Sequence, residues 1–91
     1  MTGDDPDPVL RGLRAEIDRL DAEIFSALNE RLEVVVRLKR HKDEHGLSFL
    51  DPGREQRMID DRVRANRGPL SEAGVRSFYA ELLALVKREL G

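Results

Sequence analysis

"PVLRGLRAEIDRLDAEIFSALNERLEVVVRLKRHKDEH", residues 8–45, carries the longest helical pattern in this chain. Its apolar residues recur at intervals of three and four, the spacing of one helix face. At about 100° per residue they fall in an arc roughly 80° wide. They are Leu10, Leu13, Ile17, Leu20, Ile24, Leu28, Val35 and Leu38. Pro8 suits a first helical turn and Gly46 suits a C-terminal stop, so we predict one helix from about Pro8 to His45.

Two shorter helices are predicted after the long one. In "DPGRE", residues 51–55, Asp51 can cap a helix that begins at Pro52 and ends near Asn66. "RGPLSE" interrupts the pattern, and Ser71 can cap a third helix. The predicted buried stripe of this third helix is Val75, Phe78, Tyr79, Leu82, Leu83, Val86 and Leu90. No segment has the period of a strand, so the fold class is all-α with three helices, one long and two shorter.

The length of the first helix has consequences for assembly. Thirty-odd residues at 1.5 Å per residue give a rod of roughly 55 Å, whereas a compact domain of this size has a radius of gyration of about 12 Å. One copy cannot bury such a stripe, so we expect an intertwined helical-bundle homodimer. The alternative is a break near Asn29 that yields a compact four-helix monomer. The absence of Gly and Pro between residues 13 and 45 argues against that break.

Composition and charge limit the classes of function. The 91 residues suffice for one domain, which we place at residues 8–91 after a disordered tail at residues 1–7. The 16 basic and 18 acidic residues give a net charge of −2, which argues against nucleic acid and membrane surfaces as partners. The chain has no Cys, which excludes disulfides and thiolate chemistry. With neither a signal peptide nor a membrane span, we expect a cytoplasmic protein.

Two cations interrupt the apolar stripe of the long helix. Arg31 and Lys42 are 11 residues apart and return to nearly the same helical angle. Burying them is costly unless anions meet them, and these could be Asp51 and Glu55 or an enclosed anionic ligand. The sequence offers no nucleophile and no cofactor motif. His41 and His45 have a metal-compatible spacing but point away from the stripe, so we expect no metal and no cofactor.

The chain resembles the all-α class of chorismate mutases from about Val9 to Leu90. The segments that carry the resemblance are "LRAEIDRLDAEIFSALNER" (13–31), then Lys42, then "DPGRE" (51–55). The resemblance implies an isomerase that converts chorismate to prephenate by a Claisen rearrangement, within the shikimate pathway for aromatic amino acids. A dicarboxylate substrate would explain the cations on the stripe. An enzyme for this step holds the flexible dianion in its reactive conformer and aims donors at the developing charge.

The resemblance also implies a role for each site residue. Arg31 would bind one substrate carboxylate, and Arg14 of the other subunit would bind the second. Lys42 would bond the ether oxygen and a substrate carboxylate, as the main electrostatic contact in the transition state. Glu55, with Asp51 nearby, would accept the ring hydroxyl, and Arg54 would help to fix the substrate or this local network. The apolar walls of the site would come from Val35, Leu38 and Ile59.

One departure from the family leaves the substrate open. The third helix of the family often carries a Ser and, four residues later, a Gln or Glu that donates a second hydrogen bond to the ether oxygen. In this chain Val86 and Leu90 occupy these two places. A one-residue shift of the register would offer Glu89 instead, but it would turn the apolar stripe outward. The alternatives are therefore a 4-amino-4-deoxychorismate mutase of secondary metabolism and an isochorismate-pyruvate lyase. A non-catalytic helical dimer that binds a shikimate-pathway partner is the non-enzyme alternative. A shikimate-pathway synthase could also activate the enzyme in trans.

Overall fold

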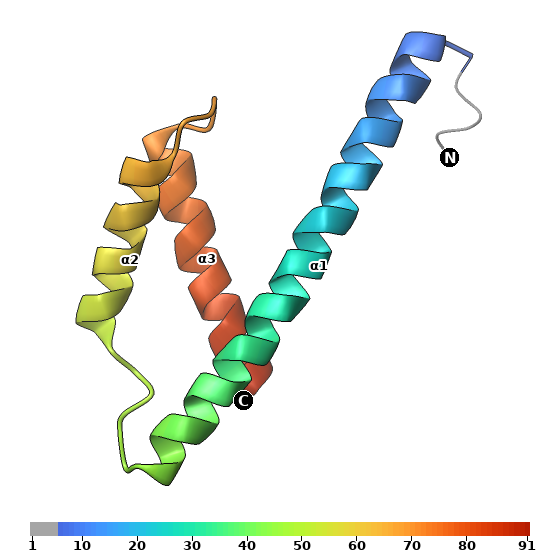
Figure 1. Cartoon of the computed structure of the whole chain (residues 1–91). Helices are drawn as coiled ribbons and strands as arrows, with labels where there is room; N and C mark the ends of the chain where they lie inside the picture. The colour runs from blue at the N-terminus through green and yellow to red at the C-terminus, as the bar shows by residue number, and fades with distance from the viewer. Residues whose placement is uncertain (1–5) are drawn as a thin grey trace. The chain divides into compact units, whose positions relative to one another are not determined.

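The computed structural model describes residues 6–91 and contains three α-helices (Figure 1). These are α1 (Pro8–Glu44), α2 (Pro52–Ala65) and α3 (Glu72–Leu90). No strand occurs among the described residues, which confirms the all-α prediction. The chain divides into two units, Met1–Arg37 and Leu38–Gly91. Residues 1–5 of the predicted tail lie outside the described residues.

α1 is a single continuous helix. It passes Asn29 without interruption, so the alternative break at that residue is not observed. At its start, the Asp7 side chain accepts hydrogen bonds from the backbone N–H groups of Val9 (2.8 Å) and Leu10 (3.4 Å). Capping of this kind satisfies N–H groups that have no partner within the helix.

The end of α1 is a Schellman turn built on Gly46. This glycine has φ +65°, in the left-handed region that favours glycine. The N–H of Leu47 donates to the carbonyl of Lys42 at 2.8 Å, and the N–H of Gly46 donates to that of Asp43 at 3.4 Å. These are the two bonds that define the motif. The predicted stop at Gly46 is confirmed.

The two shorter helices begin at the predicted caps. The Asp51 carboxylate accepts a 3.1 Å bond from the N–H of Arg54, and Pro52 is the first residue of α2. Similarly, the Ser71 hydroxyl accepts a 3.0 Å bond from the N–H of Gly74 in the first turn of α3. The starting points of both helices therefore follow from local capping chemistry.

α2 and α3 pack against each other and form the core of the unit Leu38–Gly91 (Figure 1). The buried residues are Val75, Tyr79 and Val86 of α3. Half-buried partners from both helices surround them: Met58, Ile59, Val63, Leu82, Leu83 and Leu90. The predicted stripe is thus confirmed with one exception. Phe78, predicted to be buried, is 61% exposed, and its helical angle is about 80° away from the mean of the buried three.

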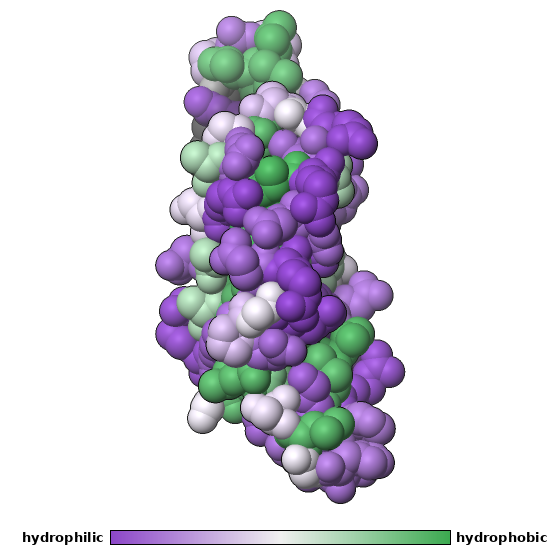
Figure 2. Space-filling model, turned by 90° about the vertical axis from the view of Figure 1, so that its left-hand side faces the viewer, coloured by the Kyte–Doolittle hydropathy of each residue, from purple (hydrophilic) through white to green (hydrophobic). Residues whose placement is uncertain are grey.

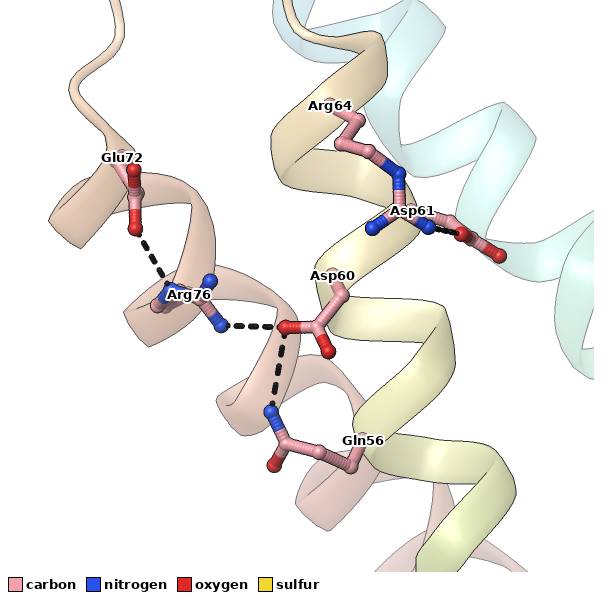
Figure 3. Close-up of polar contacts among 6 residues, drawn as sticks. All are labelled: Gln56, Asp60, Asp61, Arg64, Glu72 and Arg76. Atoms are coloured by element: carbon pink, nitrogen blue, oxygen red, sulfur yellow. Dashed lines mark hydrogen bonds and ion pairs between the residues drawn. The ribbon is translucent and has the colours of Figure 1, made fainter.

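Polar side chains also connect α2 to α3, as Figure 3 shows. Nη1 of Arg76 donates to Asp60 at 2.9 Å, and Nε of the same side chain donates to Glu72 at 3.2 Å. Gln56 donates a further 3.4 Å bond to Asp60, while Arg64 pairs with Asp61 within α2. The Arg76 hydrogen bond lowers the pKa of Asp60, and the same bond raises the pKa of Arg76.

Large apolar side chains remain exposed, many of them along α1. Six residues of its predicted stripe are between 41% and 55% exposed: Leu10, Leu13, Ile17, Leu20, Ile24 and Leu38. Figure 2 shows one face of the molecule, where hydrophobic patches lie among the hydrophilic side chains. Exposed apolar stripes of this extent are typical of surfaces that another molecule covers. Among the described residues, no helix combines the length and the hydropathy needed to cross a membrane.

Candidate active site

The predicted site residues come from α1 and from the first turn of α2. Arg14, Arg31 and Lys42 share α1, which is continuous across all three positions. Arg14 and Arg31 belong to the unit Met1–Arg37, where Arg14 is exposed and Arg31 is half-buried. The other four residues, Lys42, Asp51, Arg54 and Glu55, belong to the unit Leu38–Gly91.

The first turn of α2 brings three predicted site residues together. Asp51, Arg54 and Glu55 occupy the cap and the first turn because Asp51 and Pro52 start the helix here. Glu55 donates its backbone N–H to the carbonyl of Asp51 at 3.0 Å. Arg54 is exposed, and Lys42, in the last turn of α1, is half-buried.

Asp51 has a structural task in addition to the one predicted from the sequence. Its Oδ1 atom accepts the N–H of Arg54, so part of its hydrogen-bonding capacity is used by the helix cap. An ionised carboxylate offers about four acceptor positions. Capacity for a ligand therefore remains, and the role of Asp51 toward a substrate stays a prediction.

Glu55 has a partner that the sequence reasoning missed. Nζ of Lys87, in the last turns of α3, lies 3.0 Å from each carboxylate oxygen of Glu55. The Glu55 side chain is 28% exposed and that of Lys87 is 42% exposed. Helical periodicity could not single out this pair, because Lys87 lies about 40° beyond Leu83, outside the arc of the predicted stripe.

The end of α3 agrees with the register predicted from the sequence. Val86 is buried at 6% exposure and Leu90 is half-buried, whereas Glu89 is exposed. The one-residue shift that would turn Glu89 toward the core is therefore not observed. This part of α3 presents two apolar side chains and, beside them, the cation Lys87. Of the predicted apolar walls, Val35 and Ile59 are half-buried and Leu38 is 45% exposed.

The predicted site residues are four cations and two carboxylates. Guanidinium groups such as Arg31 and Arg54 suit bidentate binding of carboxylates. A compact ammonium such as that of Lys42 suits a single oxygen that gains negative charge. Among residues 6–91, no cluster of three or more potential metal-ligating side chains occurs.

Comparisons with known proteins agree with the resemblance seen in the sequence. The model of the family "Chorismate mutase type II" matches residues 13–89. The chain is also similar to two solved structures of chorismate mutase from Thermus thermophilus. Form I is 32% identical with a TM-score of 0.82, and the match covers 85% of this chain and 96% of that one. Form II gives a TM-score of 0.83 at 32% identity, with coverages of 87% and 90%.

Two curated relatives differ in their named activities. The 4-amino-4-deoxychorismate mutase of Streptomyces venezuelae is 37% identical over 54 residues, which are 59% of this chain and 52% of that protein. The bifunctional chorismate mutase/prephenate dehydratase of Aquifex aeolicus is 32% identical over 79 residues, which are 82% of this chain and 22% of that protein. The chain thus spans about half the length, or less, of these curated relatives.

Proposed function

Because the chain belongs to the chorismate mutase type II family, we propose that it catalyses the rearrangement of chorismate to prephenate in aromatic amino-acid biosynthesis. The observation that carries this proposal is the match to the Thermus chorismate mutase, which extends over 96% of that chain at 32% identity. The order of charged residues from Arg14 to Glu55 supports it further.

The proposed mechanism needs no covalent intermediate and no proton transfer. Arg31 and Arg14 bind the two carboxylates of the substrate and hold it in the compact conformer in which the ends of the rearranging system meet. Lys42 donates to the ether oxygen, where negative charge develops as the C–O bond breaks. Glu55 accepts the ring hydroxyl and fixes the orientation of the ring. Arg54 and Asp51 support this end of the site.

The proposed assembly is a homodimer in which α1 of one copy packs along α1 of the other. The exposed apolar stripe of α1 supports this assembly, since six of its residues are between 41% and 55% exposed in the single chain. A dimer would cover the stripe and would allow Arg14 to complete the site of the partner. Sedimentation at micromolar concentration should give a dimer; a fully active monomer would contradict the proposal.

A second candidate is the rearrangement of 4-amino-4-deoxychorismate. The Streptomyces relative carries this named activity and is 37% identical over the matched segment. A carboxylate at Glu55 can accept a bond from a ring ammonium as well as from a ring hydroxyl. The two candidates use the same cations on α1 and differ only at the ring substituent.

Direct assays distinguish these candidates. Purified protein is mixed with chorismate, 4-amino-4-deoxychorismate or isochorismate, and substrate loss is followed by ultraviolet absorbance. We expect chorismate to be converted to prephenate with the highest kcat/KM. The Arg31→Ala variant should lose this activity, whereas Arg40→Ala, at an exposed cation of the same helix, should keep it. Absence of turnover with every substrate would favour the non-catalytic alternative.

A further inference from the structure

Lys87 gives the Glu55 carboxylate a neighbour of opposite charge. Its Nζ atom lies 3.0 Å from both carboxylate oxygens of Glu55, so one ammonium bridges the whole carboxylate. The pair links α3 to the first turn of α2 and is separated by 32 positions in the sequence. It is partly exposed, so its effect on stability is small. The pair can nevertheless change which chemical groups the Glu55 carboxylate binds.

A carboxylate bridged by an ammonium is a different receptor from a carboxylate alone. About four acceptor positions exist on the two oxygens, and Lys87 occupies two of them. A neutral hydroxyl donor can use a remaining position without meeting an opposing charge. A second ammonium at the same carboxylate would lie within a few ångströms of Lys87 and would be repelled by it.

We infer that Lys87 is a specificity-determining residue, which makes the Glu55 end of the site prefer a neutral hydroxyl over a cationic amine on the substrate ring. The inference rests on the proposed function, in which Glu55 accepts the ring substituent. It deepens that proposal by selecting chorismate over 4-amino-4-deoxychorismate, since an alkyl amine is protonated near neutral pH, as the amine of Lys is.

The inference predicts that the removal of Lys87 and the removal of Lys42 have different effects on the kinetics. Lys42 acts on charge that develops during the reaction, so its removal should lower kcat for either substrate. Lys87 acts on a substituent whose charge does not change during the reaction. Its removal should therefore change the relative kcat/KM of the two substrates, mainly through KM.

The test compares both substrates in four proteins: the wild type, Lys87→Met, Lys87→Arg and Arg88→Met. The measured quantity is the ratio of kcat/KM for 4-amino-4-deoxychorismate to kcat/KM for chorismate. In Lys87→Met this ratio should rise about tenfold or more, because one nearby positive charge is removed. Lys87→Arg restores a cation and should return the ratio toward the wild-type value. Arg88→Met removes a charge from the exposed neighbouring position and should leave the ratio unchanged.

The outcomes separate the inference from the proposed function. An unchanged ratio in Lys87→Met, or an equal loss of activity on both substrates, would overturn the inference while leaving the mutase activity standing. A wild type that prefers the amino substrate would overturn it as well. A wild type that converts neither substrate would overturn the proposed function, and the inference with it. Far-ultraviolet circular dichroism of each variant checks that the helices are retained.

Discussion

Arg76 of α3 donates a 2.9 Å hydrogen bond to Asp60 of α2, and this bond lowers the pKa of the Asp60 carboxyl below its ordinary value of 3.8. Arg76 also contacts Glu72 of its own helix at 3.2 Å, so its guanidinium is held between two carboxylates (Figure 3). The bond to Asp60 connects the two helices that form the core of the unit Leu38–Gly91.

The first prediction concerns the dependence of stability on pH. A carboxyl whose pKa is lower in the folded state contributes stability above its unfolded pKa and loses it as the pH falls through the folded value. For Asp60 this loss should occur below pH 3.8. Thermal unfolding at a fixed protein concentration should show Asp60→Asn to be less stable than the wild type at pH 7. The difference should shrink as the pH is lowered below 3.8.

The matched control for this experiment is Asp61→Asn. Asp61 pairs with Arg64 within α2, whereas the Asp60 bond connects the two helices. The control removes the same charge, so it isolates the contribution of the bond between α2 and α3. If both variants lose the same stability with the same dependence on pH, the link between Asp60 and Arg76 has no specific role.

The second prediction separates the two roles of Asp51. Asn is as good a helix cap as Asp, whereas Ala is not. Asp51→Asn should therefore keep the stability of the wild type, and Asp51→Ala should lose about 1 kcal/mol in the free energy of unfolding. If Asp51 also supports substrate binding, Asp51→Asn should raise KM. An unchanged KM in a stable Asp51→Asn protein would restrict this residue to capping.

The third prediction assigns the largest catalytic contribution to Lys42. Loss of a donor to a developing oxyanion typically lowers turnover by roughly 10²–10³. Lys42→Ala should reach that range in the chorismate assay while the protein stays folded. Lys42→Arg should fail too, because a planar guanidinium does not fit where a compact ammonium donates. Near-normal turnover by Lys42→Ala on all candidate substrates would refute the proposed role.

The fourth prediction tests whether the ether oxygen has one donor or two. Leu90 occupies the place where the resemblance expects a Gln or Glu, and it is half-buried. Leu90→Gln should preserve or raise kcat for chorismate, because the amide can supply a second donor to the ether oxygen. Steady-state kinetics at matched concentrations of folded protein measures this effect. A large fall in kcat without loss of structure would show that the apolar side chain is itself needed.

The fifth prediction follows from the proposed dimer. If Arg14 of one copy completes the site that contains Arg31 of the other, mixing inactive Arg14→Ala and Arg31→Ala proteins should restore activity. After complete exchange, about half of the dimers are mixed and each contains one intact site, so roughly a quarter of the sites should be active. Native mass spectrometry confirms the exchange. Mixed dimers that remain inactive would place Arg14 outside the neighbouring site.

The positions of the helices were predictable because their ends depend on nearby residues. Asp51, Ser71 and Gly46 act on the backbone within a few residues of themselves, and the structure confirms all three. The order of charged residues along α1 and α2 likewise indicates the family, and the family match at residues 13–89 confirms it. The individual roles of those charged residues remain predictions.

The sequence by itself determined three helices, their caps and the family, since capping and helical periodicity act over a few residues. Only the tertiary structure decided which side of α3 meets α2. That choice leaves Phe78 exposed, joins Arg76 to Asp60 and places Lys87 against Glu55. The reason is that the periodicity of one helix defines an apolar arc but not its edges. Contact with a second helix decides which residues at those edges are buried, exposed or paired.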